Sequence, residues 1–176
     1  MDRHAEQFGF APMSGVIIVS TVLCVVLGVA VPIVLAVTIP SDQSAGWPVA
    51  AATAAVWATF VMVWAVGRPL EFVVSQEGLT VRWPLRRRRI PLGAIREVRR
   101  VAKADLGWTM RTCGAGGFLG GFGRFHSRRL GALDAYVANA RDLVLVRLDG
   151  PRPLLITPDR ADGFVAALRA ATGLPG

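Results

Sequence analysis

The most concentrated polar chemistry in the sequence is a run of four arginines that directly follows a tryptophan and a leucine. Guanidinium groups bind phosphates and carboxylates, and tryptophan suits the boundary between lipid headgroups and acyl chains. Two interpretations stay open. The run binds anionic headgroups, at up to about 1 kcal/mol per charge, or it only fixes the cytoplasmic side of a membrane protein. The candidate lipid or partner contacts are Trp83, Leu85, Arg86, Arg87, Arg88 and Arg89.

Nucleic-acid binding is the usual alternative for such a basic run. The chain carries a formal net charge of +8. However, no recognition helix, stacking aromatic pair or zinc-ligand spacing accompanies the arginines. We therefore expect no nucleic-acid partner.

Residues suited to catalysis or metal binding do not cluster. The sequence has no HxxxH or CxxC pair and no nucleophile set beside a base. The glycine-rich segment 114–123 lacks the Lys-Ser or Lys-Thr of a phosphate-binding loop and misses the dinucleotide fingerprint by one residue. We expect no catalytic residues, no metal site, no cofactor and no enzymatic activity. An enzymatic alternative would require four residues to share one pocket, namely Arg124, His126, Asp134 and Tyr136.

Two long uncharged runs must position the arginines. Helical spans at about 15–39 and 48–66, joined by a polar loop, predict a transmembrane hairpin over residues 14–67. The first span would make about 37 Å of helix, enough to cross a bilayer. Its insertion is favourable by about 6 kcal/mol and that of the second by about 3 kcal/mol. A cleaved signal peptide is excluded because the first run is too long and its flank carries acidic residues.

Small residues predict how the two helices pack. Alanines spaced four apart on one stripe let two backbones approach closely within lipid. The stripe consists of Ala51, Ala54, Ala55 and Ala58. Trp47 and Trp64 stand about 26 Å apart along such a helix, so each ring would rest at one membrane interface.

The distribution of basic residues predicts the orientation. Arginines follow the second span closely, whereas the connecting loop carries Asp42 and no Lys or Arg. We therefore expect a multi-pass protein of the cell membrane with both termini in the cytoplasm. Residues 1–13 would be a short cytoplasmic N-terminus, and residues 68–176 a cytoplasmic domain.

The rest of the chain alternates in the manner of β-strands. Strands at 70–75 and 79–83 would form a hairpin, which returns the arginines to the membrane surface. Further strands are predicted at 132–139, 143–148 and 153–156. A final amphipathic helix would be capped by Thr157, have Pro158 in its first turn and stop at Gly173.

These residues resemble a family. The segments Ile90-Pro-Leu-Gly-Ala-Ile95, Ala135-Tyr136-Val137-Ala138-Asn139 and Ile156-Thr157-Pro158 are similar to those of bacterial pleckstrin-homology-like (PH-like) domains that follow transmembrane helices. The resemblance implies a seven-stranded, partly open antiparallel β-barrel capped by a C-terminal α-helix. The expected fold class is an α+β membrane protein, a two-helix transmembrane hairpin followed by this barrel. Phosphoinositide-binding relatives carry basic residues in the first hairpin loop, but here that loop is Gln76-Glu77-Gly78.

The expected function follows from this combination. We expect a non-catalytic integral membrane protein whose PH-like domain is a protein-interaction or scaffolding module, an accessory subunit of a membrane complex. Its partners would be the lipid bilayer and other membrane proteins or further copies of itself. The alternative is a sensor of anionic lipid headgroups through the arginine run.

Overall fold

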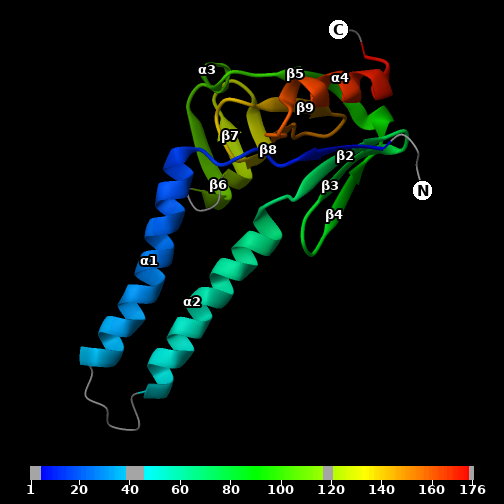
Figure 1. The fold of residues 1–176 in the computed structure, drawn as a ribbon. Helices are drawn as coiled ribbons and strands as arrows, with labels where there is room; N and C mark the ends of the chain where they lie inside the picture. Colours follow the sequence, from blue (N-terminus) through cyan, green and yellow to red (C-terminus); the bar gives the residue numbers. More distant parts are fainter. Residues whose placement is uncertain (1–4, 39–45, 117–120, 175–176) are drawn as a thin grey trace.

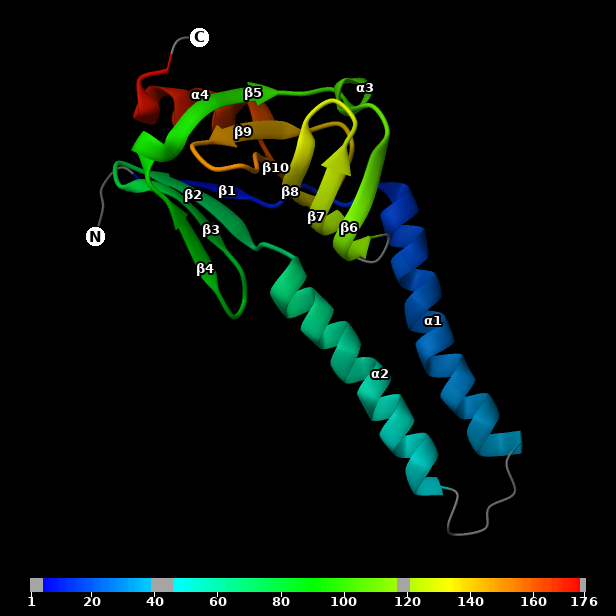
Figure 2. The ribbon, with the colours of Figure 1, turned by 180° about the vertical axis from the view of Figure 1, so that it is seen from behind.

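The computed structural model describes residues 5–38, 46–116 and 121–174. Two long helices extend together from one side of a domain rich in β-structure (Figures 1 and 2). The helices are α1 (Gly15–Thr38) and α2 (Gly46–Gly67). By length and composition, Gly15–Val34 and Trp47–Gly67 are long and apolar enough to cross a membrane, with mean hydropathies of 2.9 and 2.0.

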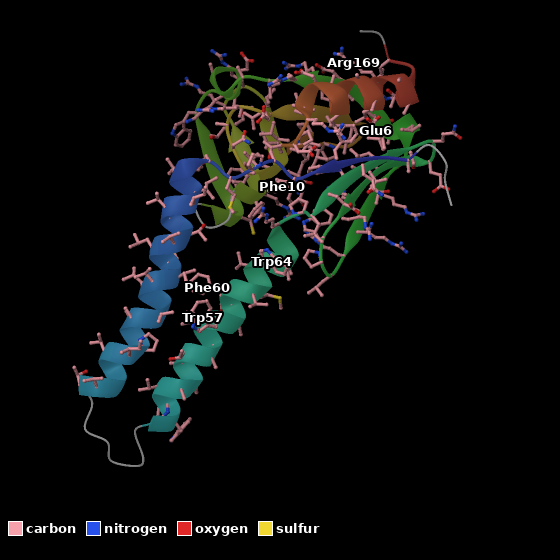
Figure 3. All side chains as sticks on the ribbon, viewed as in Figure 1. Glu6, Phe10, Trp57, Phe60, Trp64 and Arg169 are labelled. Carbon is pink, nitrogen blue, oxygen red and sulfur yellow. The ribbon has the colours of Figure 1, made fainter. Side chains whose placement is uncertain are left out.

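The two helices contact each other through a glycine of α1. A Cβ atom added at Gly28 would lie 3.6 Å from the Phe60 ring and 3.7 Å from the Trp57 ring. Figure 3 shows both aromatic side chains in the space between the helices. The alanines predicted to pack, Ala51, Ala54, Ala55 and Ala58, are all exposed. The close approach therefore comes from α1, because a bulky aromatic pair on α2 fits against a residue that has no side chain.

The residues before α1 form a strand that the sequence analysis did not predict. Strand β1 (Glu6–Gly9) pairs antiparallel with β2 (Glu71–Ser75), which lies beyond the helical hairpin. Phe8 of β1 is fully buried, and its ring meets that of Phe164 edge-on at 5.3 Å. The expected N-terminal stub is thus part of the β domain, and the hairpin is an insertion between two neighbouring strands.

β1 and β2 belong to a four-stranded antiparallel sheet. Its other strands are β3 (Gly78–Arg82) and β4 (Arg87–Ile90), and the strand order is β1-β2-β3-β4. Alternation along the strands sends Phe8, Phe72 and Val81 to the core on one face and polar residues to the other.

A second sheet contains six strands in the order β5-β9-β10-β8-β7-β6. Among the strand pairs of the described residues, β10 with β8 is the parallel one. The strands are β5 (Ile95–Arg100), β6 (Thr109–Gly116), β7 (Gly121–Ser127), β8 (Gly131–Val137), β9 (Val144–Leu148) and β10 (Leu154–Ile156). A 3₁₀ helix, η1 (Leu92–Ala94), joins the sheets, and a short helix, α3 (Lys103–Leu106), precedes β6.

The C-terminal helix α4 (Ala161–Thr172) covers the core between the two sheets. Phe164 and Leu168 are fully buried on its apolar face, and Gly173 ends it in a left-handed conformation, as predicted. The predicted cap is wrong. Thr157 lies before the helix, where its buried hydroxyl oxygen accepts a hydrogen bond from the Ala138 amide at 2.8 Å.

The described residues form an α+β fold with ten strands in two sheets, rather than the seven strands implied by the resemblance. No strand pairing among them joins the two sheets into a closed barrel. Two of the strands that the sequence analysis did not predict are β1, which lies before the hairpin, and a short β4 that begins inside the arginine run.

Candidate functional site

The turn between β3 and β4 lies against the end of α2. The indole Nε1 of Trp83 donates a hydrogen bond to the Gly67 carbonyl at 3.2 Å. Arg86 donates from Nη2 to the Val66 carbonyl at 3.1 Å. The last carbonyls of a helix have no partner within the helix, so these two side chains satisfy them and attach the turn to α2.

Two of the residues predicted to contact lipid or a partner, Trp83 and Arg86, make contacts within the protein instead. The Trp83 side chain is only 5% exposed and meets the Tyr136 ring edge-on at 5.1 Å. The Arg86 guanidinium lies 4.3 Å from the centre of the Trp83 ring, a cation–π contact. Leu85, at the tip of the turn, is 73% exposed. Of the apolar pair predicted to contact lipid, only Leu85 is therefore available.

The arginine run does not act as one cluster. Because β4 begins at Arg87, alternate side chains point to opposite faces of the sheet. Arg88 shares the inner face with its cross-strand partner Val81, and its Nη1 lies 3.2 Å from Oδ2 of Asp134 in the second sheet. Arg87 and Arg89 lie on the outer face.

The outer face of the four-stranded sheet is hollowed into a groove of about 610 Å³. The register places Gln7, Val73, Thr80 and Arg89 in one row across the four strands, and Arg82 opposite Arg87 in the next. We call this hollow the outer groove. Its polar lining consists of Gln7, Ser75, Glu77, Thr80, Arg82, Arg86, Arg87 and Arg89.

The outer groove is basic, and its charges are loosely held. Arg82 forms an ion pair with Glu71, and Nη1 of Arg89 lies 3.7 Å from Oε2 of Glu77. The Arg87 side chain has no hydrogen bond or ion pair among the described residues. Exposed ion pairs of this kind contribute only about 0–1 kcal/mol each, so the guanidinium groups can turn toward another anion.

Other basic residues near the run in sequence lie elsewhere. Arg96, Arg99 and Arg100 belong to β5 in the second sheet. Hydrogen bonding to Asp149, together with the charge of that carboxylate, raises the pKa of Arg96. Arg100 binds the Asp162 carboxylate of α4 through Nη1 at 2.9 Å. These side chains hold strands and helix together outside the outer groove.

The four residues that would have reopened an enzymatic interpretation lie on one face of β7 and β8 but differ in exposure and partners. Arg124 and Asp134 are cross-strand neighbours on β7 and β8, and His126 lies exposed further along β7. Tyr136 instead packs into the core against Trp83. In the described part of the chain, no group of three or more His, Cys, Asp or Glu side chains is placed to hold a metal ion.

The sequence analysis identified the arginines of the outer groove but not its uncharged polar residues. Gln7 lies on the unpredicted strand β1, and Ser75 and Thr80 are ordinary strand residues. Strand alternation could have separated Arg88 from Arg87 and Arg89, if the start of β4 had been known.

Comparison with known proteins identifies a family. A family model described as Bacterial PH domain matches residues 70–172. No curated protein and no solved structure matches the chain. The matched stretch begins at β2, so β1 and the two apolar helices precede it.

Proposed function

Because the chain belongs to the bacterial PH domain family, we propose that it is a non-catalytic binding module held at the cytoplasmic face of the cell membrane by the α1–α2 hairpin. In this proposal the module binds other membrane proteins, as a scaffold or an accessory subunit of a membrane complex. The family supports a binding role, and two long apolar helices support attachment to a membrane.

The insertion of the hairpin between paired strands is the observation that carries this proposal. The Phe10 amide lies 3.3 Å from the Leu70 carbonyl, so the chain leaves and re-enters the β domain at one place. The turn residues Trp83 and Arg86 hold the end of α2 at the same place. Helices attached at both ends would keep the β domain within reach of the membrane surface and its proteins.

The membrane placement is tested with tags at both ends of the full-length chain. We expect the protein to stay in the pellet after an alkaline carbonate wash and to dissolve in detergent. Protease added to intact spheroplasts should leave both tags uncut, and protease added to inverted vesicles should remove both. Recovery of the chain in the detergent-free supernatant, or cleavage of either tag in spheroplasts, would contradict the placement.

The binding role is tested by crosslinking in intact cells, followed by purification in mild detergent. We expect a defined species larger than one chain, containing either a second copy or another membrane protein in a fixed ratio. An unrelated two-helix membrane protein with the same tag, expressed at the same level, serves as the control. A monodisperse monomer with no crosslinked product would count against a scaffolding role.

A second candidate is a sensor of anionic lipid. Its specific support is that Leu85 is exposed beside the end of α2, while Arg87 and Arg89 face outward. Replacing all four arginines by Gln in the full-length chain should then reduce the anionic lipid that it retains on purification.

A further inference from the structure

The outer groove has no ligand assigned to it. We propose that it binds the phosphate of an anionic phospholipid headgroup through Arg82, Arg87 and Arg89. This inference rests on the membrane placement proposed above and deepens the second candidate. It assigns binding to one face of the four-stranded sheet instead of to the arginine run as a whole.

The register of the sheet brings the three guanidinium groups together. Arg82 and Arg87 are directly opposite each other on β3 and β4, and Arg89 lies two residues further along β4. Side chains two apart on a strand emerge about 7 Å from each other on the same face. Arginines can bridge that separation, and a phosphate offers enough oxygen acceptors for all three.

The groups are available because no buried partner competes for them. Arg87 has no polar partner among the described residues, and the carboxylates that face Arg82 and Arg89 are themselves partly or largely exposed. An incoming phosphate would replace weak, solvent-screened ion pairs. Thr80, directly opposite Arg89 on β3, adds a hydroxyl group for a headgroup oxygen.

The position of the outer groove favours a phospholipid over a soluble phosphate. The groove continues to Leu85 and Arg86, and Arg86 touches the last turn of the apolar helix α2. Both ribbon views show the β3–β4 hairpin extending toward α2, on the side of the domain from which the helices leave (Figures 1 and 2). A ligand with its phosphate at Arg87 would therefore place an apolar tail beside exposed Leu85 and α2.

The same geometry excludes the other two arginines of the run as phosphate ligands. Arg88 points inward and is held by Asp134. Arg86 is held by the Trp83 ring and the Val66 carbonyl. Arg88→Gln should therefore leave lipid affinity unchanged, although it removes the same charge from the same run.

The experiment titrates the full-length chain, in an uncharged detergent, with dioctanoyl phosphatidylglycerol and follows binding by microscale thermophoresis. Parallel arms use dioctanoyl phosphatidylcholine and inorganic phosphate. The test variant is Arg87→Gln/Arg89→Gln. The charge-matched control is Arg96→Gln/Arg147→Gln, which removes two exposed arginines from the second sheet. Thermal unfolding of each variant checks the fold, and the single variants Arg87→Gln and Arg89→Gln replace the double variant if it does not fold.

We expect Arg87→Gln/Arg89→Gln to weaken phosphatidylglycerol binding about tenfold, while Arg96→Gln/Arg147→Gln changes it less than about twofold. Phosphatidylcholine should bind much more weakly, and inorganic phosphate at equal concentration should not compete. Equal losses in both double variants, or no loss in either, would overturn the site. Competition by inorganic phosphate would overturn the lipid assignment. Any of these results leaves the carbonate wash and the tag assay unaffected, so the membrane placement is judged separately.

Discussion

At the scale of single residues, Gly78 begins β3 with a backbone conformation that other residues rarely adopt. Its φ angle is +149°, and an added Cβ would overlap the carbonyl oxygen of Ile90. The clash is with backbone, which cannot rotate away. The glycine lets β3 start close to the end of β4, and so it sets the register that faces Arg87 and Arg89 outward.

We therefore predict that Gly78→Ala lowers the free energy of unfolding of the full-length chain by about 2–4 kcal/mol. Chemical unfolding in a mild detergent, followed by tryptophan fluorescence, measures this change. Gly93→Ala is the matched control because nothing lies within 4 Å of its added Cβ, and it should change stability by less than about 0.5 kcal/mol. Similar values for the two variants would contradict the backbone clash.

The arginine run shows what could be predicted at this scale and what could not. Strand alternation correctly predicted the hairpin of β2 and β3, and the turn that follows it lies beside the end of α2. The sequence analysis did not predict β4, which begins at Arg87 inside the arginine run. The start of β4 is fixed by its pairing with β3, and a four-residue strand of mostly arginine has no apolar alternation to reveal it.

At the scale of elements, β1 links the N-terminus to the core. Phe8 is fully buried against Phe164 of α4, and the tilted ring of Phe10 lies 6.2 Å from that of Phe72 in β2. β1 escaped prediction because it has four residues and its partner lies beyond the hairpin. Strands β2, β3, β8, β9 and β10 and helix α4 were predicted because their own residues carry the period of the element.

We predict that Phe8→Ala lowers the free energy of unfolding by about 3–5 kcal/mol, the usual range for removing a buried ring. Gln7→Ala, one residue earlier on the exposed face of β1, should cost less than about 0.5 kcal/mol. The same unfolding assay measures both. If Phe8→Ala were as mild as Gln7→Ala, β1 would not contribute to the core.

At the scale of the whole molecule, the β domain is discontinuous in sequence. An isolated fragment that starts at Leu70 lacks β1, and the edge of β2 would lose the strand that pairs with it. The hydrophobic runs predicted two helices, and the resemblance to bacterial PH-like domains, confirmed by the family match over residues 70–172, implied the α+β domain. The division into two sheets and the insertion of the hairpin depend on contacts between distant residues, which local patterns do not encode.

We predict that a chain joining residues 1–14 to residues 68–176 through a short Gly-Ser linker folds without the helices. The ends to be joined are close, since Phe10 and Leu70 are hydrogen-bonded. Dispersed amide signals in a two-dimensional NMR spectrum should identify the folded state. Residues 70–176 alone should give a collapsed spectrum or aggregate. Well-dispersed signals from that shorter piece would show that β1 is dispensable.

The interruption of the sheet by α1 and α2 also sets an order for biogenesis. During synthesis β1 is made before α1 and α2, and its partner strand β2 is made only after both apolar helices. Until then Phe8 and Phe10 have nothing to pack on. Pairing of β1 with β2 therefore follows synthesis of the hairpin, and a nascent chain with a misplaced hairpin would leave Phe8 and Phe10 uncovered.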